Sequence, residues 1–385
     1  MAERIAAEGF LPGEFISEEL DERGWSQADL AEIIGKTPGM VNELIKGKRK
    51  VTPDIAEGLS AALGMSAEYW TNLETAYQYW LLRRHREQPP ISQRKARLMS
   101  IAPYRELIRR GWIESSNDVD VLEENVLVFL GMKSVDDTPA KIVHVARKST
   151  SYAEVPPALY AYLRKARQIA HGVHAQPFEI DCLRTTLPNL KAFCKNSEDV
   201  RLVPKLLAEA GVRLVIVEHL AGTKVDGATL RLEDGSPVIV LSLRYDRIDS
   251  FWHALMHEIG HILNEDGEVV DSNLVGEDAT TSDEKPTSEN KADEFAVEFL
   301  VPQAPLRTFI NNHSPLYYAR DIQGFAQVHR VHPGIVVGQL HHVGELKYNQ
   351  FREFLNKVRL MVTNSALTDG WVQLSLNSKH GIGEE

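Results

Sequence analysis

The chain has 385 residues, which is enough for two or three domains that each bury a core of their own. Hydrophobic residues make up 43% and charged residues 25%, as is ordinary for a soluble globular protein. The formal net charge of −11 argues against nucleic-acid binding until that charge is located along the chain.

The negative charge is concentrated in one stretch. Residues 265–294 carry eleven Asp and Glu against two Lys, whereas residues 23–50 carry six Lys and Arg against three Asp and Glu. The N-terminal region is therefore open to a nucleic-acid partner. The charged N-terminus has no apolar signal core, and no apolar run approaches the roughly 20 residues of a membrane span. We therefore expect no membrane partner. The two cysteines form no CxxC pair and suggest no disulfide framework, so we expect the protein in the reducing cytoplasm.

Short helices with clear start and stop signals fill the N-terminal region. They are predicted over residues 16–24, 26–35, 37–47, 52–64 and 66–84. Ser26 and Thr37 stand at N-cap positions, and Pro38 stands at a first helical position. A linker containing two prolines follows at residues 86–95. We expect residues 10–88 to form an all-α helix-turn-helix domain.

The second and third of these helices have the layout of a helix-turn-helix, in which the start of the second helix enters the DNA major groove. The residues expected near the bases are Lys36, Thr37, Gly39, Met40, Asn42 and Glu43. The residues expected to contact phosphates are Gln27, Lys46, Lys48, Arg49 and Lys50. The alternative interpretation is a small helical domain with a lysine-rich turn.

This segment resembles the Cro/C1-type repressors over about residues 10–85. Within them it is similar to the HigA-type antitoxins through "VTPDIAEGLSAALGMSAEYW", residues 51–70. The resemblance implies operator binding in double-stranded DNA, with a homodimer on paired half-sites. Gly39 and Met40 stand where such proteins often carry Ser or Thr, so the base preference does not carry over. Four aromatic residues are expected in the core or at a dimer seam: Trp70, Tyr77, Tyr79 and Trp80.

Residues 95–200 are predicted to form a helical middle domain without evident chemistry. A helix over residues 199–211, a strand over 212–220 and a hairpin turning at Asp234-Gly235 follow. The whole chain is expected to be mainly α, with a small α+β domain over residues 201–345 and an extension over 346–385.

The next helix contains "HALMHEIGH", residues 253–261. His257 and His261 lie one turn apart on the same face, with Glu258 beside them. Two neutral imidazoles can bind Zn²⁺ without cancelling its charge, so a bound water becomes acidic. Glu258 can take its proton and deliver it to a leaving amine. The alternative is a helix whose polar face happens to be rich in histidine.

Two neighbouring features favour the metal site. Gly260 costs about 1 kcal/mol of helix stability relative to Ala, which makes sense if something must approach the metal closely. The strand predicted at residues 237–243 could run along an extended peptide substrate.

A further ligand is available in the predicted helix at residues 288–302. Glu289 is expected as the third zinc ligand, which leaves the fourth position for water, and Asp293 is expected to accept a hydrogen bond from a ligand imidazole. The alternative is that both are solvated charges. A row from His253 to His261 spans about 12 Å, too far for one tetrahedral ion, so His253 is expected beside the site or in the substrate cleft. The candidate oxyanion donors are Tyr317, Tyr318 and His332.

This half resembles the ImmA/IrrE family of metallo-endopeptidases over about residues 200–345. The similar segments are "HEIGHIL", "ENKADEFAVEFLVP" and "VHPGIVVGQL". The resemblance implies a zincin-like fold, Zn²⁺ held by His257, His261 and Glu289, Glu258 as the catalytic carboxylate, and cleavage of a specific regulatory protein. Asp293 stands where the family often has Asn, and "SFWHALM" differs from the usual preceding run.

Together these features predict a DNA-binding transcription regulator carrying a zinc endopeptidase that cuts a repressor, an antitoxin-like protein or itself. A second interpretation is a non-catalytic, HigA-like regulator whose metallopeptidase-like half senses a metal, ligand or partner. A third is an antitoxin that neutralises a toxin by contact. Glu258 favours the enzyme, because a structural zinc site needs no carboxylate between its histidines. The acidic stretch at residues 265–288 is expected to be mobile.

Overall fold

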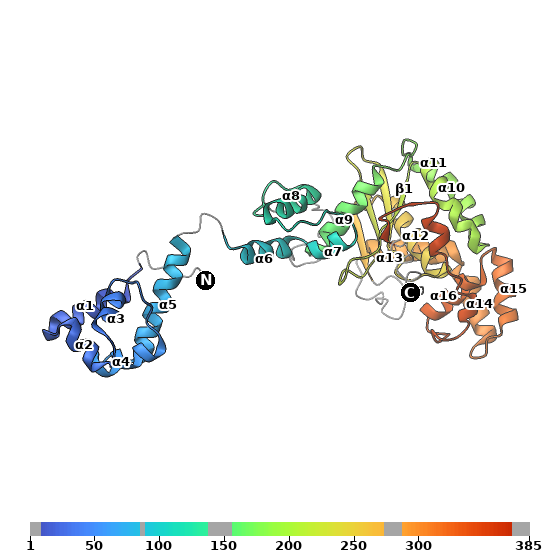
Figure 1. Ribbon diagram of the computed structural model, residues 1–385. Coiled ribbons are helices and arrows are strands. Elements are labelled where there is room, and N and C mark those ends of the chain that lie inside the picture. The colour runs from blue at the N-terminus through green and yellow to red at the C-terminus, as the bar shows by residue number, and fades with distance from the viewer. Residues whose placement is uncertain (1–8, 85–88, 138–155, 273–286, 372–385) are drawn as a thin grey trace, which may run out of the picture. The chain divides into compact units, whose positions relative to one another are not determined.

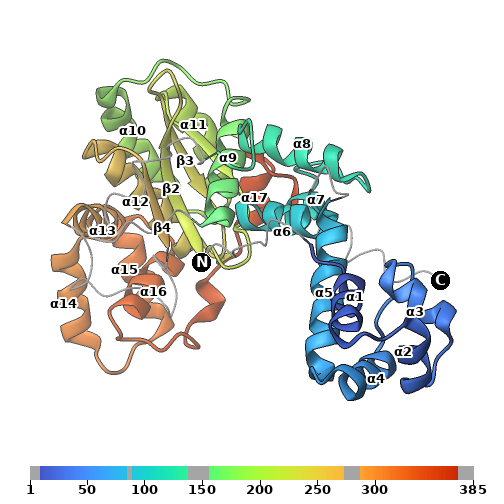
Figure 2. The same ribbon diagram turned by 90° about the vertical axis from the view of Figure 1, so that its left-hand side faces the viewer.

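The computed structural model describes residues 9–84, 89–137, 156–272 and 287–371. The chain divides into two compact units, Met1–Arg94 and Lys95–Glu385. Helices predominate in both, and the sheet lies in the second unit (Figures 1 and 2), so the prediction of a mainly α chain with a small α+β part is confirmed. No helix among the described residues is long and apolar enough to cross a membrane.

The first unit is helical, as predicted. Its helices are α1 (Pro12–Arg23), α2 (Gln27–Ile33), α3 (Pro38–Ile45), α4 (Pro53–Leu63) and α5 (Ala67–Arg84). The Ser26 hydroxyl accepts the N–H of Asp29, whose carboxylate accepts the N–H of Ser26 in return, so α2 begins with a capping box. The Thr37 hydroxyl caps α3 by accepting the N–H of Met40. The core closes around apolar side chains that include the fully buried Trp70.

The second unit is built on a five-stranded sheet with the order β4-β2-β3-β1-β5. The strands are β1 (Arg213–Ile216), β2 (Val225–Arg231), β3 (Pro237–Leu241), β4 (Val269–Ser272) and β5 (Leu367–Thr368). The antiparallel β2–β3 pair is the predicted hairpin, and Gly235 at its turn has a φ of 80°. β1 runs parallel to both β3 and β5.

The position of β3 corrects one expectation. This strand was expected to run along a peptide substrate, but it lies in the middle of the sheet between β2 and β1. Both of its edges are already hydrogen-bonded, so no peptide can pair with it. The strand at the edge of the sheet beside β2 is β4.

Helices cover both faces of the sheet (Figure 2). On one face α9 (Pro157–Ala170) contacts the strands, and α6 (Ile91–Ile101), α7 (Tyr104–Arg109) and α8 (Val119–Leu130) share its core. On the other face α11 (Val203–Glu209) and α12 (Ile248–Leu263) contact the strands. The helices that share their core are α10 (Ile180–Phe193), α13 (Thr287–Leu300), α14 (Gln303–His313), α15 (Ala319–His329), α16 (Pro333–His342) and α17 (Arg359–Thr363). Alternate side chains of a strand enter the two cores: Ile239 joins the second, and Val238 and Val240 join the first.

The expected boundaries at residues 200 and 345 fall inside this one compact unit. Helix α9 contacts β1, β3 and β5, so the predicted middle domain packs, through its described residues, on the same sheet as the predicted metallopeptidase segment. Val358 and Val362 join its core and β5 joins its sheet, so the described part of the 346–385 extension belongs to it as well. Helix α6 begins at Ile91, inside the expected linker.

Candidate metal centre

Helix α12 carries the histidine motif on its buried side. Phe251, Trp252 and Leu255 pack into the core, and the helix lies against α13 and β2. His257 and His261 are both 0% exposed. The two histidines of the motif therefore do not lie on a solvent-exposed helix face.

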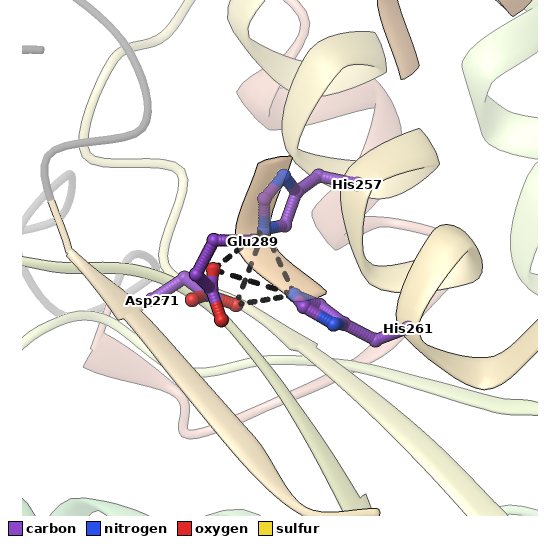
Figure 3. A group of neighbouring side chains, drawn as sticks. All are labelled: His257, His261, Asp271 and Glu289. Carbon is purple, nitrogen blue, oxygen red and sulfur yellow. Dashed lines mark hydrogen bonds and ion pairs between the residues drawn. The ribbon is translucent and has the colours of Figure 1, made fainter. Parts of the chain in front are cut away.

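Four side chains from three elements converge on one point (Figure 3). His257 and His261 extend from α12, and their Nε2 atoms are 3.0 Å apart. Glu289 reaches in from α13, with its Oε2 atom 3.3 Å and 3.5 Å from those two nitrogens. Asp271 reaches in from β4, with its Oδ2 atom 3.5 Å and 3.4 Å from them. From the sequence, water was expected in the fourth corner, and Asp271 was not expected there.

Carboxylates behind the imidazoles fix how they present their nitrogens. His257 Nδ1 lies 2.8 Å from Asp293 Oδ1, as the sequence predicted, and His261 Nδ1 lies 2.9 Å from Asp266 Oδ2. In the neutral tautomer each Nδ1–H donates to its carboxylate, so each Nε2 turns a lone pair inward. Two lone pairs and two carboxylate oxygens then face one another, an arrangement that requires positive charge between them.

The pKa shifts within the cluster also show that positive charge is favoured between these residues. Burial by itself lowers the pKa of both imidazoles, but the carboxylates around them, Asp271 first, outweigh burial. The pKa of His257 is raised well above its ordinary value, and that of His261 is raised to about 10. Burial raises the pKa of Glu289, but its contacts with the two imidazoles outweigh that and hold it well below the usual range. A bound cation would replace the protons that the imidazoles otherwise hold.

The residues present fit a zinc ion. Zinc–nitrogen and zinc–oxygen bonds of about 2.0–2.1 Å put the corners of a tetrahedron about 3.3–3.4 Å apart. The five distances given above, from 3.0 to 3.5 Å, agree with that spacing. The Asp271 Oδ2 atom is buried and accepts no hydrogen bond from the described part of the chain. Imidazoles combined with carboxylates are a donor set that suits zinc.

Glu258 is fully buried beside the cluster and faces the sheet. Its Oε2 atom accepts a 2.7 Å hydrogen bond from the Thr229 hydroxyl on β2, and its Oε1 atom has no hydrogen-bond partner among the described residues. Gly227 makes room for it, because a Cβ there would lie 2.2 Å from Oε1. Burial, and then the charge of Asp271, raises the pKa of Glu258 well above its ordinary value. This carboxyl is suited to hold a proton.

His253 lies next to the site and outside the four-residue cluster. Its Nε2 atom is 3.8 Å from Asp293 Oδ1, the carboxylate oxygen that also contacts His257. His253 therefore lies beside the carboxylate that contacts the His257 imidazole.

Gly260 has a different role from the one expected. A Cβ at this position would lie 3.1 Å from the Ala292 Cα and 3.3 Å from the Phe295 ring. What approaches closely at Gly260 is helix α13, not a substrate at the metal. The glycine lets the helix that carries His257 and His261 lie close to the helix that carries Glu289.

The three candidate oxyanion donors have other contacts. The Tyr317 hydroxyl donates to Glu345 Oε2 at 2.8 Å, and burial together with that carboxylate raises its pKa to about 12. His332 caps α16, with its Nδ1 atom accepting the N–H of Gly334. Tyr318 is exposed. None of these contacts reaches the metal cluster.

Asp271 and Asp266 contact the two imidazoles but were not predicted to do so from the sequence. Asp266 is only five positions after His261, just past the end of α12, and this spacing was the available signal. Asp271 had a weaker signal: a carboxylate directly after two valines, in a segment that was interpreted only as acidic loop. Residues 273–286 of that loop lie outside the described residues.

The first unit presents the predicted DNA-contacting residues on α3 and in the segments next to it. The exposed ones are Gln27, Thr37, Gly39, Lys46, Lys48, Arg49 and Lys50, and the half-buried ones are Lys36, Met40, Asn42 and Glu43. Two of the cations have carboxylate partners, since Lys36 pairs with Asp54 and Arg49 pairs with Glu43.

The four aromatic residues that were expected in the core or at a dimer seam divide between core and surface. Trp70 belongs to the core, whereas Tyr79 is 59% exposed and Tyr77 stacks on Trp80.

Comparison with known proteins divides the chain in the same two parts. Residues 16–70 match the helix-turn-helix family, and residues 210–340 match the IrrE N-terminal-like domain of the M78 peptidases. Both resemblances are therefore confirmed. The HTH-type transcriptional regulator YddM of Escherichia coli strain K12 is 36% identical over 66 residues, which are 17% of this chain and 70% of that protein. Virulence-associated protein I of Dichelobacter nodosus is 37% identical over 67 residues, 17% of this chain and 62% of that protein.

Solved structures also match a short part of the chain. An antidote protein of a plasmid maintenance system from Nostoc punctiforme is 35% identical, with a TM-score of 0.20, over 20% of this chain and 86% of its own. The Pseudomonas aeruginosa antitoxin HigA, solved with the higBA promoter, is 27% identical, with a TM-score of 0.20, over 22% of this chain and 98% of its own.

Proposed function

The chain belongs to the Cro/C1-type helix-turn-helix family through its N-terminal domain and carries an IrrE-like domain in its C-terminal half, and from this premise we propose a DNA-binding regulator with zinc-dependent endopeptidase activity. The observation that carries the proposal is the convergence of two imidazoles and the Glu289 carboxylate next to the buried Glu258. Zinc hydrolases use this combination of ligands and proton carrier.

The chain's own groups have distinct roles in this reaction. His257, His261 and Glu289 would hold the ion, which when bound activates water and polarises the peptide carbonyl. Asp293 and Asp266 keep the imidazole Nε2 atoms turned inward.

Proton transfer is assigned to Glu258. This residue takes up a proton at its carboxyl group and passes it to the leaving amine of the cut peptide, while Thr229 fixes the orientation of that carboxyl.

The proposed substrate is a specific regulatory protein: a repressor, an antitoxin-like protein or this chain itself. The proposal is supported by the presence of a DNA-binding domain and a peptidase-like domain in one chain. Cleavage of a regulator would change transcription at the operator to which the first unit binds.

Operator binding is assigned to α3 and the basic run after it. Lys46, Lys48 and Lys50 are exposed and can neutralise phosphates, while the start of α3 enters the major groove. A homodimer would place two such helices on paired half-sites. Tyr79 and Leu82 on α5, 59% and 53% exposed, offer apolar surface for the dimer contact. Light scattering at two protein concentrations tests the dimer.

A non-catalytic sensor is the second candidate, and the observation that favours it is Asp271. Zinc sites with four protein ligands are commonly structural, whereas catalytic sites keep one position open. The two candidates differ in whether Glu258 matters for any reaction.

Metal analysis followed by a cleavage assay tests the proposed function. We expect purified wild type and Glu258→Gln to retain zinc and His257→Ala to lose it. Wild type is then incubated with a panel of purified helix-turn-helix repressors, and products are identified by intact mass. Cleavage by wild type and not by Glu258→Gln supports the enzyme. Equal cleavage by both variants, or failure of the wild type to bind zinc, contradicts it.

A further inference from the structure

We propose that Asp271 is a fourth protein ligand of the metal, so that the chain closes its own site, which gains an open position only when Asp271 withdraws. This inference rests on the proposed function, because it concerns the same ion. It replaces the water expected in the fourth corner with a side chain from β4.

Asp271 and Glu289 hold their carboxylate oxygens at similar distances from the two imidazoles. Asp271 Oδ2 lies 3.5 Å and 3.4 Å from the two imidazole nitrogens, and Glu289 Oε2 lies 3.3 Å and 3.5 Å from them. The two carboxylate oxygens are therefore equivalent in distance to the histidine pair (Figure 3). If Glu289 is a ligand at this distance, Asp271 is one by the same measure.

The pairing of β4 with β2 places Asp271 on the side of the sheet that faces α12. In the β2–β4 ladder Asp271 is opposite Gly227 and Val269 is opposite Thr229, and both β2 residues face Glu258 on α12. Gly227 has no side chain, so nothing on β2 stands between Asp271 and the helix.

The alternation along β4 fits this orientation. Val270 turns to the opposite face and packs with the helices there. The register shift between Val225 and Gly227 is an irregularity of the kind that re-aims side chains near active sites.

The Asp271 carboxylate is buried, and one of its oxygens lacks a hydrogen bond within the described part of the chain. Asp271 is 6% exposed, and its Oδ2 atom accepts no hydrogen bond from the described residues. A buried carboxylate oxygen without a hydrogen bond is costly, and the nearest cationic groups to it among the described residues are the two imidazoles, at 3.5 Å and 3.4 Å. A cation bound between the histidines would compensate the negative charge of this carboxylate.

The location of Asp271 also indicates how the site could open. β4 has four residues and is paired on one side only, with β2, in the described sheet. A slip by one residue turns every side chain of a strand to the other face. Such a slip of β4 would withdraw Asp271 and leave the fourth position to water or substrate.

The test compares wild type with Asp271→Ala, each loaded with Co²⁺ in place of zinc. Acetohydroxamate is added as a small metal-binding probe, and the visible cobalt spectrum reports whether it reaches the ion. We expect the wild-type spectrum to stay unchanged at millimolar probe. The Asp271→Ala spectrum should change, with probe affinity on the order of tenfold tighter or more. Glu268→Gln removes a nearby carboxylate that contacts Arg167 and Arg231, and it should behave as wild type.

The outcomes separate this inference from the proposed function. A wild-type protein that binds Co²⁺ and responds to the probe as strongly as Asp271→Ala overturns the closed site and leaves the proposed peptidase standing. A wild-type protein that binds neither Co²⁺ nor zinc overturns both. If Asp271→Ala does not fold, Asp271→Asn keeps the volume of the side chain, and the wild-type response alone still decides whether the site is closed.

Discussion

Glu258 can lie against the sheet because the residue beneath it is a glycine. The built Cβ of Gly227 would overlap Glu258 Oε1 at 2.2 Å, in a region where both residues are buried. The sequence predicted Glu258 from its place between the histidines, but nothing in the sequence links it to a glycine 31 positions earlier. That link exists only because β2 and α12 pack together.

Substitution of Gly227 by Ala should therefore destabilise the second unit. We expect a loss of about 1–3 kcal/mol in the free energy of unfolding, as overpacking typically costs, measured by urea denaturation. Gly324→Ala is the control, because Gly324 lies inside α15 with nothing within 4 Å of its built Cβ. It should gain up to about 1 kcal/mol. Equal stability of the two variants would contradict this packing argument.

The two cysteines should differ sharply in reactivity. Cys194 is fully buried, and burial raises the pKa of its thiol to about 12, so hardly any thiolate forms near neutral pH. Cys182 is exposed. An aromatic disulfide reagent should label one thiol per native chain and both after denaturation. Rapid native labelling of both, with Cys182→Ser still labelled once, would refute the burial of Cys194.

At the level of elements, the sequence predicted best where the signals are local. Ser26 and Thr37 fixed the starts of α2 and α3, because an N-cap hydroxyl acts within three residues. β4 was missed because four residues give no measurable alternation, and its strand pairing depends on β2, far away along the chain. Three of the four cluster residues were predicted, since they lie on periodic helices, and Asp271 was not, since it lies on that strand.

The segment after α3 gives a quantitative prediction about DNA binding. Lys48 is exposed and lies just beyond the recognition helix, so we expect it to neutralise one phosphate. Lys48→Ala should reduce the slope of log K against log salt concentration by about 0.9, measured by fluorescence anisotropy on operator DNA. Lys205→Ala, an exposed lysine on α11 of the second unit, should leave that slope unchanged. An unchanged slope for Lys48→Ala would remove Lys48 from the interface.

For the whole molecule, the division into two units separates the two chemistries. Every residue of the metal cluster lies in Lys95–Glu385, and every predicted DNA contact lies in Met1–Arg94. The sequence predicted this separation, but it also drew domain boundaries where helical composition changes. Those boundaries fall inside one compact unit, because helices far apart in the sequence pack on the same sheet. Local composition carries no information about that packing.

Removal of the metal should therefore affect one unit alone. A ligand at a hundredfold excess over its Kd stabilises its domain by about 2.7 kcal/mol, so chelation should lower the Tm of the second unit, Lys95–Glu385, by roughly 4–5 °C. Calorimetry should show the transition of the first unit unmoved. His257→Ala, already without its metal, should not respond to chelator. A chelator effect of equal size on both transitions would contradict this assignment.

The complete burial of His257 and His261 has a kinetic consequence. An ion held by two imidazoles that solvent does not touch cannot be extracted while its surroundings keep their native packing. It leaves only through transient local opening, whose frequency is a property of the protein. Above a certain chelator concentration the rate of metal loss should stop rising. The plateau would equal the rate at which α12, α13 or β4 move apart.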